Sequence, residues 1–159
     1  MRLSSKLAFA AAAVLGLAAL LIVSKRHAAE IAGGLPPRIV CASQGEALAL
    51  AGVGATAVLG TGSMAPWIPA ALPGNDPLTT VVAYAVMDPA ASFEGITTGA
   101  LVVYTPGWSK ARVLHQAALR DSGGWIMSGL QNERSETWER VTAANYIGTV
   151  SRVYVWAQR

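Results

Sequence analysis

The sequence predicts a mainly β protein, in which an antiparallel β domain follows one N-terminal transmembrane helix. Two patterns lead to this fold class: one long apolar run near the N-terminus, and several later runs of β-branched and aromatic residues bounded by Gly, Pro, Asp or Ser. The 159 residues, 53% of them hydrophobic, suffice for one domain with a modest core. The single cysteine excludes an internal disulfide.

The apolar run Leu7–Val23 is uncharged and lies between Lys6 and Lys25. As a helix it spans about 26 Å, close to the thickness of a bilayer core. A cleaved signal peptide is the alternative, but charged residues follow the run where a small-x-small cleavage site is needed. We therefore predict a membrane anchor over 1–27, a linker over 28–44 and a β domain over 45–159. Positive charges before the run favour a non-cytoplasmic β domain.

The predicted elements of the domain follow in chain order. Glu46–Ala51 is predicted as a short helix, and a β-rich run covers 55–59. Further strands are predicted over 79–87, 100–105, 111–119, 125–127 and 146–156. Asp121–Gly124 has the composition of a hairpin turn, whereas Asn132–Ala144 is polar and is predicted as a loop.

Composition also excludes several function classes. The net charge of +3 comes from four basic residues in the first 26, while 27–159 holds eight Lys and Arg against nine Asp and Glu. A nucleic-acid binder would concentrate basic residues on its folded part, so no nucleic-acid partner is predicted. Two histidines and one cysteine are too few for a His/Cys metal site, and no metal or cofactor is predicted. Cys41 is predicted as a buried thiol and not as a lipidation site.

The segment Gly60–Pro66, with the sequence GTGSMAP, contains the candidate nucleophile. Ser63 follows a β-rich run and lies in a glycine-containing turn, where its hydroxyl and nearby backbone N–H groups are accessible to a substrate. Most serines in such turns have no chemical role, so the segment alone does not decide between a turn residue and a nucleophile.

A serine nucleophile needs a base, and the domain offers two candidates. His115 is its only histidine, and an imidazole suits general-base work near neutral pH. Lys110 is its only lysine and is the alternative base. It lies in a predicted turn, and a lysine must be desolvated to act as a base, which favours His115. His115 has an alternative role as well, that of a hydrogen-bonded histidine that serves the structure and not the chemistry.

Four segments in order resemble type I signal peptidases, whose fold is shared with repressor-type self-cleaving peptidases. Ser63–Pro66 resembles the Ser-Met-x-Pro box, and Gly99–Tyr104 resembles the Gly-Asp-Ile-Val-Val-Phe strand. Val113–Gln116 resembles the Val-Val-His-Arg segment of the Ser-His subclass. Gly129–Asn132 resembles Gly-Asp-x-Asn, and the later segment 147–150 also fits.

The resemblance implies roles for four residues. Ser63 would be the nucleophile and His115 the general base, while the hydroxyl of Thr61 and the backbone N–H of Ser63 would hold the oxyanion. Glu136 would orient the imidazole, and Glu133 is the other acid that could take this role. The chain departs from the family where Ala100 and Leu130 replace acids and Gln116 replaces Arg.

The resemblance further implies a membrane-anchored serine endopeptidase that cleaves leader or signal segments of preproteins after small residues. The walls of its substrate site would be 55–59 and 79–87. Two other functions stay open: a catalytically inactive structural or interaction module, which the lost acids favour, and a self-cleaving regulator, for which Ala51-Gly52 offers a small scissile pair. The apolar cluster Trp67–Pro69 either touches the membrane surface or packs on the β core.

Overall fold

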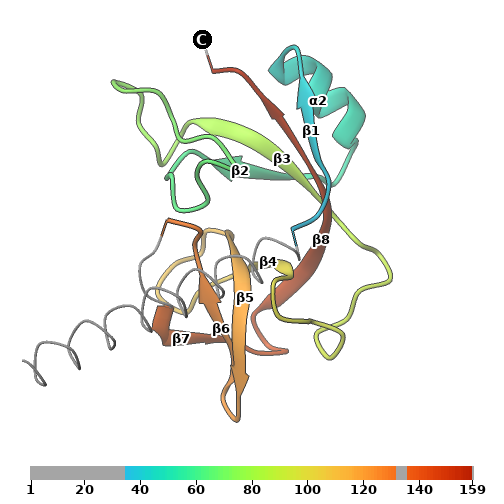
Figure 1. Cartoon of the computed structure of the whole chain (residues 1–159), viewed down its shortest axis with the longest axis vertical. Helices are drawn as coiled ribbons and strands as arrows, with labels where there is room; N and C mark the ends of the chain where they lie inside the picture. The colour runs from blue at the N-terminus through green and yellow to red at the C-terminus, as the bar shows by residue number, and fades with distance from the viewer. Residues whose placement is uncertain (1–34, 132–135, 159) are drawn as a thin grey trace, which may run out of the picture. The chain divides into compact units, whose positions relative to one another are not determined.

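A computed structural model describes residues 35–131 and 136–158, with the backbone alone described for 136–139. Within these residues the fold is a curled, largely antiparallel β-sheet with one short helix (Figure 1), so the mainly β prediction is confirmed. The elements in chain order are β1 (Arg38–Cys41), α2 (Gln44–Ala51), β2 (Thr56–Leu59), β3 (Val81–Met87), β4 (Leu101–Tyr104), β5 (Val113–Asp121), β6 (Gly124–Ser128), β7 (Glu136–Val141) and β8 (Tyr146–Trp156).

The sheet is organised around the long strand β8. Its strand order is β2-β3-β8-β4-β5-β6-β7, with β1 added in parallel to the C-terminal part of β8. The first half of β8 pairs with β4, and its second half pairs with β3. Figure 1 shows β1, α2, β2 and β3 grouped at one end of β8 and β4–β7 at the other.

The predicted strands and the hairpin turn match the structure closely. Strands β3, β4, β5, β6 and β8 lie at the predicted segments with shifts of a few residues, and β5 and β6 form the predicted hairpin, in which Asp121 pairs with Gly124. The predicted short helix is α2. Its N-cap Ser43 accepts a hydrogen bond from the backbone N–H of Glu46 at 3.2 Å, and the helix ends at Gly52, whose φ is +79°.

Two segments differ from the prediction. The range 132–144 was predicted as a loop, but Glu136–Val141 forms β7, an edge strand that pairs with β6. Edge strands tolerate charged side chains, and the charges of this segment concealed its strand character. The range 28–44 was predicted as a linker, but Arg38–Cys41 within it forms β1 on β8.

Three clusters of apolar side chains make up the core. The largest contains residues from β2, β3, β4, β5 and β8 together with Met64 and Ile68 of the loop after β2. Cys41 is buried in another cluster as predicted, and burial, followed by the nearby charge of Glu46, raises the pKa of its thiol.

The predicted anchor over residues 1–27 lies outside the described residues. Within 35–131 and 136–158, no helix is long and apolar enough to cross a bilayer.

Candidate active site

The turn after β2 holds Ser63 at the surface of the largest core cluster. The backbone N–H of Gly60 donates to Thr80 O, and Gly60 O accepts from the N–H of Ala71, both at 2.9 Å. A Cβ atom at Gly60 would lie 2.5 Å from the backbone nitrogen of Ala71, so this position is closed to larger residues. Gly62 has φ +83°, which favours glycine, and lets the chain turn immediately before Ser63.

Contacts on both sides of the chain fix the serine backbone. Met64, directly after Ser63, is only 4% exposed and belongs to the core. Gln131 crosses from the segment after β6: its backbone N–H donates to Ser63 O at 3.0 Å, and its side-chain Nε2 donates to Ala65 O at 2.9 Å. The half-buried Ser63 side chain therefore projects from a turn that is held at both ends.

His115 reaches Ser63 from the other part of the sheet. It lies on β5 opposite Val102 of β4 and is 7% exposed. Its Nε2 lies 3.1 Å from Ser63 Oγ, although the two residues are 52 positions apart in the chain. The ring of Tyr104 lies beside the imidazole, with centroids 6.4 Å apart. The 3.1 Å distance between Ser63 Oγ and His115 Nε2 permits direct proton transfer between the hydroxyl and the imidazole.

Thr61 is the third predicted residue at this point. Its Oγ1 lies 3.4 Å from Ser63 Oγ, within hydrogen-bond distance, and its side chain is exposed. The backbone N–H of Ser63 donates to no acceptor among the residues that the structure describes. A hydroxyl and an unoccupied N–H therefore lie next to the nucleophile, as an oxyanion site requires.

The alternative base does not line the pocket, although its neighbours Ser109 and Ala111 do. Lys110 is exposed on the loop between β4 and β5, and it is not one of the residues that line the pocket beside Ser63. Ser63, Thr61 and His115 are therefore brought together, and Lys110 is not.

The predicted orienting acid is only partly located. Glu136 is the first residue of β7 and its backbone pairs with Met127, but its side chain lies outside the described residues. At the two positions where signal peptidases, which the sequence resembles, have acids, Ala100 packs against the core cluster around Tyr104, and Leu130 packs against the largest cluster. The role of Glu136 stays a prediction.

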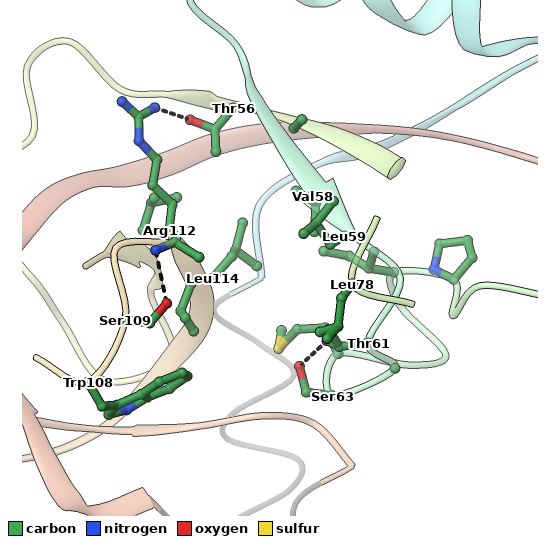
Figure 2. A pocket seen from close by; sticks show the side chains of 18 residues that line it. Thr56, Val58, Leu59, Thr61, Ser63, Leu78, Trp108, Ser109, Arg112 and Leu114 are labelled. Atoms are coloured by element: carbon green, nitrogen blue, oxygen red, sulfur yellow. Dashed lines mark hydrogen bonds between the residues drawn. The ribbon is translucent and has the colours of Figure 1, made fainter. Parts of the chain in front are cut away.

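A pocket of about 400 Å³ opens beside Ser63 (Figure 2). Most of its wall is apolar, and its lining residues are Thr56–Leu59, Thr61–Met64, Ile68, Pro69, Leu78, Val103, Trp108, Ser109 and Ala111–Leu114. The predicted wall at 55–59 is therefore largely present, in β2. None of residues 79–87 lines this pocket, and the loop after β4 and the start of β5 form its other wall.

The residues around the pocket show where the apolar cluster Trp67–Pro69 lies. They also include an aromatic residue, Trp108, that was not predicted from the sequence. Ile68 is 2% exposed and Trp67 packs against the same cluster, so Trp67–Pro69 belongs with the β core. The exposed aromatic side chain at the pocket is Trp108, which is 68% exposed. Its turn sequence, Pro-Gly-Trp-Ser, stands shortly before the strand of His115 and is the signal that would have indicated it.

Comparison with known protein families, with curated proteins and with solved structures finds no match to this chain.

Proposed function

We propose that the protein is a membrane-anchored serine endopeptidase similar to type I signal peptidases, which removes leader or signal segments from preproteins. Its β domain would have the fold of that family, and residues 1–27 would be the anchor. The observation that carries the proposal is the 3.1 Å contact between Ser63 Oγ and His115 Nε2 at the edge of an apolar pocket.

The geometry supports a two-step acyl transfer. In the first step, His115 Nε2 takes the hydroxyl proton as Ser63 Oγ attacks the scissile carbonyl carbon. The negative charge moves to the carbonyl oxygen, where the Ser63 N–H and the Thr61 hydroxyl donate to it. The C–N bond then breaks, and the imidazolium gives its proton to the leaving amine. In the second step, His115 activates a water that hydrolyses the ester and releases Ser63.

Unpaired strand edges support binding of an extended peptide. Among the described residues, β2 pairs only with β3, and the pairing of β6 with β5 begins only at Gln116, so Val113–His115 have one neighbouring strand. Both edges border the pocket. A peptide in extended conformation would use these backbone groups as hydrogen-bond partners and place its side chains in the apolar pocket.

The experiment that tests the proposal uses the full-length protein in detergent or liposomes with preproteins that carry small-x-small sites. We expect cleavage by the native protein and by Lys110→Ala, and losses of at least about 10³-fold in kcat for Ser63→Ala and His115→Ala. Cleavage that depends on Lys110 and not on His115 would overturn the assignment of the base.

Two other outcomes distinguish the remaining functions. A native protein that cleaves none of several leaders but binds them would favour the inactive interaction module. Cleavage within the chain itself, with no cleavage of added preproteins, would favour a self-cleaving regulator. Mass spectrometry of the products identifies the scissile bond in either case.

A further inference from the structure

One charged side chain lines the described part of the pocket, and it lies at the end remote from Ser63. Figure 2 shows Arg112 beside Thr56 at one end, and Thr61 with Ser63 at the other. A guanidinium N–H of Arg112 donates to Thr56 Oγ1 at 3.3 Å, and Thr56 is only 6% exposed. A buried side chain of β2 therefore holds the guanidinium at the end of the pocket.

The charge of Arg112 is not neutralised within the described residues. The ion pair present there joins Arg140 to Asp121, on the β5–β6 hairpin and β7. Arg112 is exposed and keeps further N–H donors, because a guanidinium carries five and one is used by Thr56. A planar donor group with free N–H groups suits a carboxylate, which accepts two parallel hydrogen bonds from it.

The pocket between Ser63 and Arg112 is apolar. Val58, Leu59 and Leu114 lie between its two ends in Figure 2, and no Asp or Glu is among the described residues of its lining. A charged substrate side chain would lose its hydration along this stretch without gaining a partner. The arrangement thus favours a peptide whose middle is apolar and whose charge lies at the Arg112 end.

The geometry of an extended strand sets the number of substrate residues between the scissile bond and Arg112. A peptide that starts at Ser63 and follows β2 from Leu59 back to Thr56 brings a residue beside Arg112 about four to six positions from the scissile bond, at about 3.3 Å per residue. We assign this residue to the N-terminal side, because that half of the substrate stays bonded to Ser63 in the acyl-enzyme and gains most from a retained contact.

We infer that Arg112 is a specificity-determining residue, which binds an acidic side chain of the substrate four to six residues before the scissile bond. This inference rests on the proposed function for its place in cleavage. The substrate class is then a segment with an acidic residue, a short apolar stretch and the scissile bond, in that order.

Cleavage is tested with peptides that differ only at these positions. Each peptide carries Glu, Gln or Lys at position four, five or six before the same scissile bond, and kcat/KM is measured with full-length protein. We expect the kcat/KM of the Glu peptide to exceed that of the Gln peptide by about five- to tenfold at one position, mainly through a lower KM. This difference should disappear at high salt. Arg112→Gln should remove the difference, and Arg112→Glu should reverse it in favour of Lys.

Binding is tested separately so that the two proposals can fail independently. Ser63→Ala protein, which keeps the pocket, is titrated with the same labelled peptides and their dissociation constants are compared. Tighter binding of the Glu peptide that depends on Arg112 supports the inference even when no peptide is cleaved. The matched control is Arg152→Gln, an exposed arginine of β8 outside the pocket, which should keep the preference. Equal binding of the Glu and Gln peptides, or a preference for Glu that survives Arg112→Gln, would overturn the inference about Arg112.

Discussion

At the scale of single residues, the candidate site has a second hydroxyl next to the proposed nucleophile. Thr61 Oγ1 lies 3.4 Å from Ser63 Oγ on an exposed part of the turn. A donor of this kind stabilises the oxyanion in the transition state and contributes little to folding, because its side chain is not buried. Its substitution should therefore change the rate and not the stability.

We predict that Thr61→Val lowers kcat about 10²-fold while KM and the melting temperature stay nearly unchanged. Thr61→Ser, which keeps the hydroxyl, is the matched control and should retain most of the activity. Steady-state kinetics with one peptide substrate measure both variants. A Thr61→Val protein with native kcat would show that the Ser63 N–H acts without this hydroxyl.

The sequence predicted some residues of the candidate site and missed others, for a physical reason. Ser63 and His115 were predicted, because a serine in a glycine-containing turn and a lone histidine in a strand restrict the choices to a few residues. Thr61 was predicted only through the resemblance to signal peptidases. Trp108 and Arg112 were not predicted as site residues. Both belong to the loop before β5, and only the tertiary fold determines that this loop faces β2.

At the scale of elements, the turn after β2 depends on close packing at Gly60. A Cβ atom there would lie 2.5 Å from Ala71 N and 2.8 Å from a methyl carbon of Val82 on β3. The backbone nitrogen of Ala71 cannot move without loss of its hydrogen bond to Gly60 O. The turn and β3 must therefore separate if any side chain is introduced.

We predict that Gly60→Ala destabilises the fold by about 1–3 kcal/mol and also lowers activity, because it displaces Ser63. Gly45→Ala is the matched control. Gly45 lies in the helix α2, and its nearest neighbour is Ser43 Oγ at 3.9 Å, so alanine there should add about 0.5–1 kcal/mol of stability. Urea unfolding measures both variants. A Gly60→Ala protein as stable as the native one would contradict the packing at this turn.

An ion pair joins the β5–β6 hairpin to the edge strand β7. Arg140 Nη2 lies 2.8 Å from Asp121 Oδ2, and Arg140 Nε donates to the same oxygen at 2.9 Å. The hydrogen bond from Arg140, followed by that from the N–H of Gly123, lowers the pKa of Asp121. A lowered pKa means that the carboxylate stabilises the fold above its unfolded-state pKa, and that this contribution is lost as pH falls through the folded-state value.

We predict that Asp121→Asn lowers the melting temperature at pH 7 and leaves it unchanged at pH values below the folded-state pKa. The difference should shrink in high salt, because the pair is partly exposed. Asp88→Asn, at an exposed carboxylate outside this ion pair, is the control for a change of net charge. Thermal unfolding at a series of pH values measures the effect, and a difference independent of pH would contradict the role of the ion pair.

The elements that the sequence predicted share one property. Strands β3, β4 and β5 are rich in β-branched or apolar residues that are buried. The sequence of each strand therefore indicates by itself that the strand belongs to the core. The missed strands lack it: β7 contains three charged residues, and β1 buries only Cys41. Pairing with β6 and β8 supplies what these segments lack, and that pairing is a tertiary property.

At the scale of the whole molecule, the candidate dyad depends on the curl of the sheet. In the strand order, β3, β8 and β4 lie between β2, which leads into Ser63, and β5, which holds His115. Four strand spacings of about 4.8 Å would separate β2 from β5 by about 19 Å in a flat sheet. The 3.1 Å contact between Ser63 and His115 is possible because the sheet curls and the turn after β2 reaches across (Figure 1).

The curl itself is built into the central strands. The pairing register shifts between Val103 and Tyr104 where β4 meets β8, and between Val86 and Met87 where β3 meets β8. Such irregularities bend a strand and increase its local twist. The contact between Ser63 and His115 therefore depends on strands that contribute no residue to the proposed catalytic pair.

We predict that peptidase activity is lost together with the global fold and not before it. The urea midpoints of activity and of far-UV circular dichroism should coincide in the full-length protein. Val153→Ala, a fully buried substitution in β8, should lower the free energy of unfolding by about 1–3 kcal/mol and move both midpoints equally. Activity that disappears at lower urea than the β-sheet signal would instead mean that the turn carrying Ser63 opens on its own, and that local contacts, more than the curl, hold the nucleophile against His115.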